Sequence, residues 1–273
     1  MLLQTIKEFV DHTREELKQR WKRWPVDLAK GEIHEAVGAL LARQVTLATQ
    51  LALSPSIWNG HIAPLLLRSM ADVYITLAWI LKAPDERARK FILYGLGQEK
   101  LQLEHRKTQI ADRRSTPEEQ LMIDASEAWI NSQRFTFLTE VNLGSWSGLP
   151  TREMADQAGC LDFYNYVYMP FSACAHSMWH HIARYNLIQC SNPLHQYHWV
   201  PQDRELGIDP DYLYLAAKYL QKAFATFDET LGIVLQGPSA FEKLCDAMEQ
   251  LAHAGESGED QEHPEIRESQ AGA

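Results

Sequence analysis

Cysteines are few in this sequence, and their spacing does not suggest disulfide bonds. The four cysteines lie far apart and include no C-x-x-C pair, which excludes a compact disulfide framework. The N-terminal segment carries charged residues from Lys7 onward and lacks the apolar core that a signal peptide needs. We therefore expect a cytoplasmic protein with reduced thiols.

One run without charged residues is long enough to suggest a membrane span. Residues 163–183 carry no formal charge, but they include Asn165, Pro170 and His181, which are too polar for contact with lipid. This segment is therefore predicted to be a central buried helix, and no contact with a membrane is expected.

Basic residues do not dominate the chain, because 26 of them stand against 36 acidic residues, for a net charge of −10 at pH 7. This balance excludes a uniformly basic coat for nucleic acid. Half of the net charge belongs to residues 254–273, which contain six acidic residues and Arg267 as the one base. Since Ile266 is their one strongly apolar residue, they cannot bury enough surface to fold. We predict one domain over residues 1–253 and a disordered acidic tail over residues 254–273.

Apolar residues recur at helical spacing along most of the chain, and no alternating strand pattern competes with them. The predicted fold is therefore all-α, a single multi-helix bundle. Residues 190–210 contain three prolines and no clear period, which indicates an irregular connection. Pro170 is expected to kink the helix in which it lies. Prolines, glycines and capping residues give helices over about 3–24, 33–52, 61–82, 84–113, 116–140, 151–158, 162–188, 211–235 and from 239 to the tail.

Two polar stripes interrupt otherwise apolar helices. Arg68 and Asp72 are four residues apart in the third predicted helix, so they share one face of it. Tyr168, Ser172 and His176 have the same spacing in a later, aromatic helix. Each residue in such a series is rotated by about 40° from the one before, so the three stay on one side. An arginine in such surroundings needs a partner, because an unpaired buried charge is very costly.

The residue types in these stripes allow two interpretations. Histidine can act as acid or base near neutral pH and arginine can bind phosphate, which together are the minimum for cleaving RNA through its 2′-hydroxyl. In this interpretation Arg68 holds a phosphate, His176 transfers protons, and three side chains orient them: Asp72, Ser172 and Tyr168. The alternative is a polar network that fixes the helix register without catalysis. A site needs a cleft that reaches solvent, whereas such a network should be sealed.

The spacings R-x3-acid and Y-x3-S-x3-H resemble those of a family of uncharacterised bacterial helical proteins, known as a domain of unknown function. The resemblance covers about residues 60–186 and rests on the five residues of the two stripes: Arg68, Asp72, Tyr168, Ser172 and His176. Such domains are broadly similar to HEPN-type helical bundles, which include RNA-cleaving toxins and defence nucleases. The resemblance thus implies a HEPN-like toxin or defence effector that acts on RNA. The R-x4–6-H motif of active HEPN nucleases does not occur, so a non-catalytic interaction or sensor module stays as the alternative.

No motif for a cofactor or a metal is found. The sequence contains no E-x-x-H pair of the diiron bundles, no phosphate-binding loop and no dinucleotide fingerprint. His176 and His180 are four residues apart but lack the glutamate of H-E-x-x-H. We therefore expect neither a cofactor nor a metal.

Two basic stretches are the candidate contacts for RNA. Residues 18–24, KQRWKRW, combine four cations with two tryptophans, a composition that suits phosphates and stacked bases. Residues 82–114 hold nine basic residues against five acidic ones. Both indicate RNA contact if they flank the histidine; otherwise they are solvated helix faces with the tryptophans packed inward. Aromatic apolar faces on many helices also predict a homodimer.

Overall fold

The structure, a computed structural model, describes residues 2–111, 115–133 and 145–259, with side chains as far as residue 253. These ranges are mostly helical, so the predicted all-α class is confirmed. A short hairpin of β1 (Leu187–Gln189) and β2 (Trp199–Pro201) is their one sheet. The α-helices are α1 (Leu2–Arg23), α2 (Gly31–Ala52), α3 (Ala63–Lys82), α4 (Pro84–Ile110), α5 (Pro117–Ser132), α6 (Thr151–Gln157), α7 (Leu161–Phe163), α8 (Met169–Ala175), α9 (Trp179–Tyr185), α10 (Asp211–Leu231) and α11 (Ala240–Glu259).

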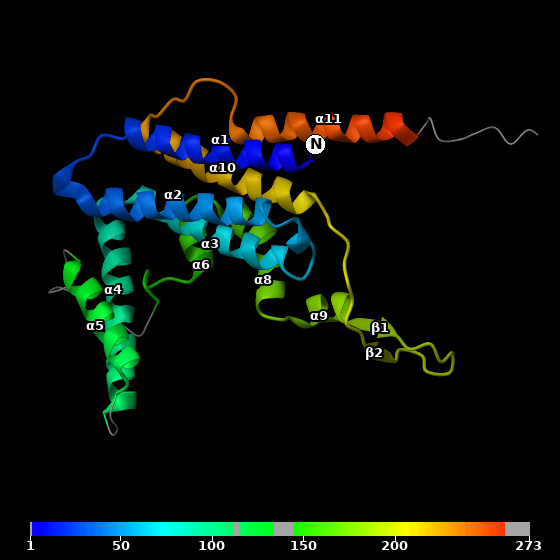
Figure 1. Cartoon of the computed structure of the whole chain (residues 1–273), viewed down its shortest axis with the longest axis horizontal. Helices are drawn as coiled ribbons and strands as arrows, with labels where there is room; N and C mark the ends of the chain where they lie inside the picture. Colours follow the sequence, from blue (N-terminus) through cyan, green and yellow to red (C-terminus); the bar gives the residue numbers. More distant parts are fainter. Residues whose placement is uncertain (1, 112–114, 134–144, 260–273) are drawn as a thin grey trace, which may run out of the picture.

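The centre of the body is α3, which packs against α2, α10 and α8 (Figure 1). Its fully buried side chains are large and apolar, and they include Leu67, Met70, Ile75, Leu77 and Ile80. In the described part of the chain, α3 is also the one helix long and apolar enough to cross a membrane, yet most of that stretch is buried inside the protein. Its apolar character is therefore that of a core helix.

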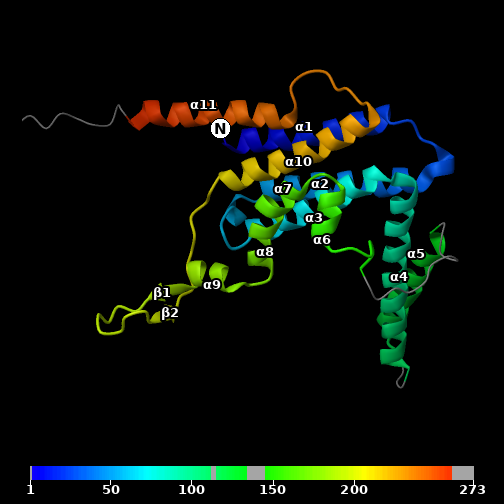
Figure 2. The same cartoon turned by 180° about the vertical axis from the view of Figure 1, so that it is seen from behind.

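The helices from the two ends of the chain lie together with α10 on one side of the body, as Figures 1 and 2 show. Ser239 caps α11 as predicted, because its hydroxyl accepts from the Glu242 backbone N–H at 3.1 Å and the Glu242 carboxylate accepts from the Ser239 backbone N–H at 2.7 Å. α11 continues to Glu259, six residues into the segment predicted as the acidic tail. The remainder of that segment, residues 260–273, lies outside the described residues.

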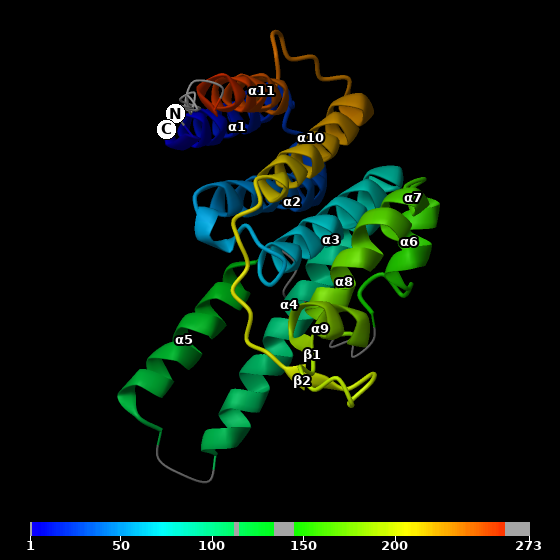
Figure 3. The same ribbon diagram turned by 90° about the vertical axis from the view of Figure 1, so that its right-hand side faces the viewer.

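Helices α4 and α5 form a pair that projects from the body as an arm (Figure 3). The arm has a small core of its own, formed by Leu103, Ile123 and Ile130. Thr116 caps α5 in the predicted way, in a reciprocal capping box with Glu119. α5 ends at Ser132, before the predicted end near residue 140, and residues 134–144 lie outside the described residues.

The long helix predicted over residues 162–188 is interrupted. A π-helical turn, Tyr164–Tyr168, joins α7 to α8, so the irregularity lies just before Pro170 and the helix continues past it. The full break comes later, where α8 ends at Ala175 and Ser177 adopts the left-handed conformation with φ 49°. The prediction of one continuous helix is therefore wrong, and the chain turns between residues 175 and 179.

The sequence pattern did not indicate the hairpin: β1 begins within the last residues of the predicted helix 162–188, and β2 lies in the connection predicted as irregular, residues 190–210. β1 and β2 pair in antiparallel register, with Gln189 opposite Trp199 and Leu187 opposite Pro201. Each strand has three residues, too few for an alternating pattern to stand out from the surrounding loop.

Candidate functional site

The packing of α3 against α8 brings the two predicted polar stripes together. Arg68 on α3 donates from Nε to the hydroxyl of Ser172 on α8 over 2.6 Å. It also donates from Nη1 to the carboxylate of Asp72, one turn along its own helix. The Ser172 hydroxyl donates in turn to the backbone oxygen of Tyr168 at 2.8 Å. Arg68 therefore finds partners in both stripes, and its guanidinium joins the two helices.

The ring of Tyr168 forms one wall of the site. The Arg68 guanidinium carbon lies 3.3 Å from the centroid of this ring, in a cation–π contact. The ring stacks on that of Tyr164 with centroids 4.8 Å apart, and its hydroxyl donates to the hydroxyl of Thr151 on α6 at 3.4 Å. Because these contacts fix the ring on both sides, the guanidinium plane has one preferred orientation.

His176 lies at the rim of the site. It directly follows α8, and its side chain is exposed to solvent. His180, which a continuous helix would keep on the same side, belongs to α9, beyond the left-handed turn at Ser177. The two histidines therefore do not form a helical i, i+4 pair, and the spacing that resembled a metal-binding motif is not realised.

The carboxyl of Asp72 is the electrostatically perturbed group of the site. Burial raises its pKa above the usual value, although Arg68, Tyr168 and His176 act in the opposite direction. Burial also raises the pKa of the Tyr168 phenol, against the effect of its hydrogen bond to Thr151. Asp72 therefore accepts a proton more readily than an ordinary aspartate does.

The site has a buried side and a solvent-facing side. The exposed fraction of the side chain increases from 4% at Ser172 through 12% at Arg68 to 49% at Asp72. Among the described residues, none accepts a hydrogen bond from Nη2 of Arg68. The cluster is thus partly exposed to solvent, on the side of Asp72.

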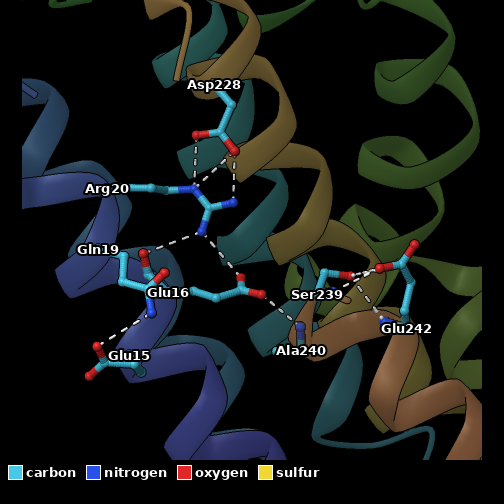
Figure 4. A network of polar contacts seen from close by, with 8 residues as sticks. All are labelled: Glu15, Glu16, Gln19, Arg20, Asp228, Ser239, Ala240 and Glu242. Atoms are coloured by element: carbon cyan, nitrogen blue, oxygen red, sulfur yellow. Dashed lines mark hydrogen bonds and ion pairs between the residues drawn. The ribbon is translucent and has the colours of Figure 1, made fainter. Parts of the chain in front are cut away.

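The basic stretch 18–24 lies in α1, which packs on α2 and α11 and is separated from α8 by the body (Figure 1). Figure 4 shows Arg20, in its middle, paired with Asp228 of α10 and with Glu16. Arg20 is only 4% exposed, and Trp24 packs its ring 5.2 Å from that of Phe227. The stretch does not flank His176, and its central cation and Trp24 are used for internal packing.

The second basic stretch follows α4 along the arm. At its start, Arg87 stacks over Trp79 at 3.8 Å and donates to the side-chain oxygen of Gln157 at 3.1 Å. Further along, Lys107 pairs with Glu104 at 3.2 Å. Part of this positive charge is therefore engaged within the protein, while residues 112–114 lie outside the described part.

The family model of a domain of unknown function, DUF5677, matches residues 34–193, more than half of the chain. The chain belongs to the DUF5677 family. The match spans α2 to β1 and contains the whole Arg68 site, whereas α1, α10 and α11 lie outside it. No curated protein and no solved structure matches the chain significantly.

Two further residues of this DUF5677 chain belong to the site but were not indicated by the sequence. Tyr164 stacks on Tyr168, and its position four residues earlier was an available signal. Thr151 bonds the Tyr168 hydroxyl from another helix, 17 residues away, so no local spacing reveals it.

Proposed function

We propose that the Arg68 site of this DUF5677 protein acts on RNA as a metal-independent ribonuclease of HEPN-like type, suited to a toxin or defence effector. The observation that carries the proposal is a guanidinium held by several partners, with an exposed histidine that acts electrostatically on the same carboxylate, Asp72. The Arg68 guanidinium lies over the Tyr168 ring and is held by Ser172, and among the described residues none accepts a hydrogen bond from its Nη2 edge. Such an edge can donate charge-assisted hydrogen bonds to a phosphate oxygen.

The proposed reaction is transesterification at a phosphodiester. His176 accepts the proton of the ribose 2′-hydroxyl while that oxygen forms a bond to phosphorus. The bond from phosphorus to the 5′-oxygen breaks, and the leaving oxygen takes a proton from solvent, which gives a 2′,3′-cyclic phosphate and a 5′-hydroxyl. Arg68 stabilises the negative charge that develops on the phosphate oxygens. Asp72 orients Arg68 through their ion pair.

One observation favours a second candidate, a non-catalytic interaction module. Two edges and one face of the Arg68 guanidinium are already engaged, by Ser172, Asp72 and Tyr168. Contacts of this kind are sufficient to fix the register of α3 against α8 without any ligand. In that case Arg68 contributes to stability alone.

A cleavage assay with defined ends separates the two candidates. The purified full chain is incubated with total RNA and with a labelled oligoribonucleotide, in the presence of a chelator and without added metal. A matched oligonucleotide carries 2′-O-methyl groups, which remove the attacking hydroxyl. The Arg68→Lys variant keeps the charge but cannot bond Ser172 and lie flat on Tyr168 in the same way.

The ribonuclease predicts fragments that end in a 2′,3′-cyclic phosphate, resistance of the methylated oligonucleotide, and a loss of rate of at least about 100-fold in Arg68→Lys. The interaction module predicts no cleavage by the wild-type chain. Equal cleavage by wild type and Arg68→Lys would mean that the activity does not belong to this site.

A further inference from the structure

The loop of the β1–β2 hairpin gathers three side chains of the kinds that bind transition metals. Cys190, His195 and His198 each present one ligand atom, and these atoms lie within 4.8 Å of one another. The hairpin contains no residue of the Arg68 site and projects away from the body at the end of α9 (Figure 1). We propose that these three residues form a binding site for one Zn²⁺ ion.

The strand register explains why two of the ligands face each other. Gln189 pairs with Trp199, and the next pair outward is Cys190 with His198. The Cys190 backbone N–H donates to the His198 backbone oxygen at 2.9 Å, so the ladder continues to this pair. Side chains opposite each other across two strands have Cβ atoms about 4.5–5.5 Å apart, within reach of a shared ion.

The loop turns back to provide the third ligand. The His195 backbone N–H donates to the Asn192 backbone oxygen at 3.0 Å, and the His198 N–H donates to the His195 oxygen at 3.2 Å. These turns place Nδ1 of His195 at 3.6 Å from the Cys190 sulfur. For tetrahedral Zn²⁺, bonds of about 2.3 Å to sulfur and 2.0–2.1 Å to nitrogen separate the two ligand atoms by about 3.6 Å. The observed spacing is therefore that of a coordinated pair.

The conformation of the loop is difficult to explain by packing. Every residue from Ser191 to Trp199 is exposed, so no core holds the loop in place. Tyr197 nevertheless adopts the left-handed conformation, with φ 61°, which is unfavourable for a bulky residue. It directly precedes His198 and sets the direction in which that ligand points. An ion bound by residues on both sides would stabilise a turn that buried contacts do not.

The ligand types favour zinc over the hard cations. Thiolate and imidazole suit Zn²⁺, whereas Ca²⁺ and Mg²⁺ require oxygen ligands. Three protein ligands leave the fourth tetrahedral position to water or to a donor from another molecule. Binding releases the thiol proton of Cys190 and fixes the remaining proton of His195 on Nε2.

The site is tested with the full chain, free of any polyhistidine tag, after removal of metal with a chelator. Zn²⁺ is added back, unbound metal is removed, and the metal content is measured by mass spectrometry. Co²⁺ serves as the spectroscopic probe, because bound thiolate gives a charge-transfer band and tetrahedral geometry gives intense visible bands. Cys190→Ser and His198→Ala are the test variants. Cys245→Ser and His180→Ala are the matched controls, because they remove a cysteine and an exposed histidine elsewhere.

The proposal predicts one Zn²⁺ per chain in the wild type and in both controls, and the thiolate band on titration with Co²⁺. Each test variant should weaken Zn²⁺ binding by at least about 100-fold. Zn²⁺ should also slow the cleavage by chymotrypsin after Leu194 and Tyr197, which are strongly exposed, and should have no such effect on Cys190→Ser. Zn²⁺ binding that is as weak in the wild type as in Cys190→Ser, or equal losses in the two controls, would overturn the proposal and leave a sulfur–imidazole hydrogen bond.

Discussion

The replacement of Asp228 by alanine tests the ion pair that joins α1 to α10. Asp228 accepts from Nε and Nη2 of Arg20 at 2.9 and 2.7 Å, and the guanidinium lies 3.8 Å from the centroid of the Phe224 ring (Figure 4). The exposed fractions are 4% for Arg20 and 19% for Asp228, so the pair is largely removed from water. Asp228→Ala leaves the Arg20 charge buried with Glu16 as its remaining acidic partner.

The expected magnitude follows from this geometry. Removal of one partner of a buried ion pair costs about 3–5 kcal/mol. Glu16 still accepts from Nη1 of Arg20 at 3.2 Å, so we expect the lower end, about 3 kcal/mol. Since 1 kcal/mol corresponds to about 2–4 °C in a chain of this size, Tm should fall by about 6–12 °C.

Thermal unfolding followed by far-ultraviolet circular dichroism measures the effect. Asp85→Ala is the matched control, because Asp85 pairs with Lys30 at 2.9 Å on the exposed surface, and its loss should leave Tm unchanged. The double variant Arg20→Met/Asp228→Leu should be more stable than Asp228→Ala, because it removes the buried Arg20 charge, while Glu16 still accepts from the Ala240 backbone N–H at 2.7 Å. A Tm of Asp228→Ala within about 1 °C of the wild type would refute the assignment of Arg20 to the interior.

Three further predictions concern the Arg68 site and one close helix contact. Ser172→Ala leaves Nε of Arg68 without its acceptor and should lower the free energy of unfolding by about 1–3 kcal/mol in urea titrations. Because burial raises the pKa of Asp72 from 3.8, its protonated form favours folding, and this contribution is lost as the pH rises through the folded pKa. The stability of the wild type relative to Asp72→Asn, measured in urea, should therefore fall as the pH rises above about 4, and a constant difference would contradict this. Gly38→Ala places a Cβ 2.5 Å from the Trp21 ring and should destabilise the chain by about 1–3 kcal/mol in the same assay, whereas a gain in stability would contradict the close contact.

Local signals in the sequence were sufficient for most of the helices. The capping residues Thr116 and Ser239 begin α5 and α11 as predicted, because a cap depends on residues within one turn. The apolar period likewise predicted the helix over residues 61–82. The prediction of residues 163–183 as the central buried helix is wrong, because most of that segment is exposed or half-buried and α3 lies at the centre instead. The projection of α4 and α5 as an arm was not predicted, since it depends on which helices meet in space.

The break after α8 shows where local patterns fail. Residues 162–188 keep a helical period, and the one expected irregularity was Pro170. The structure instead has a π-helical turn, Tyr164–Tyr168, before Pro170, and the helix breaks at Ser177, which has φ 49°. Neither proline nor glycine marks that position, so the turn depends on the tertiary packing around it.

The sequence predicted which residues form the candidate site, but it did not predict the long-range partners of the basic residues. The spacings placed Arg68 with Asp72 and Ser172 with Tyr168, and the structure brings the four together. By contrast, Arg20, in the basic stretch 18–24, forms an ion pair with Asp228, which is 208 positions away in the sequence. A charge run in sequence does not reveal such a partner, and this limits what composition can say about an RNA-binding surface.

The most direct test of the central claim compares two histidines that are four residues apart. His176 and His180 are both exposed, but His176 directly follows α8 and acts electrostatically on Asp72, whereas His180 belongs to α9. We predict that His176→Ala lowers the rate of oligoribonucleotide cleavage by about 100-fold or more, while His180→Ala retains the wild-type rate and both variants keep the wild-type Tm. Equal rates in the two variants, or no cleavage by the wild-type chain, would contradict the assignment of ribonuclease activity to the Arg68 site.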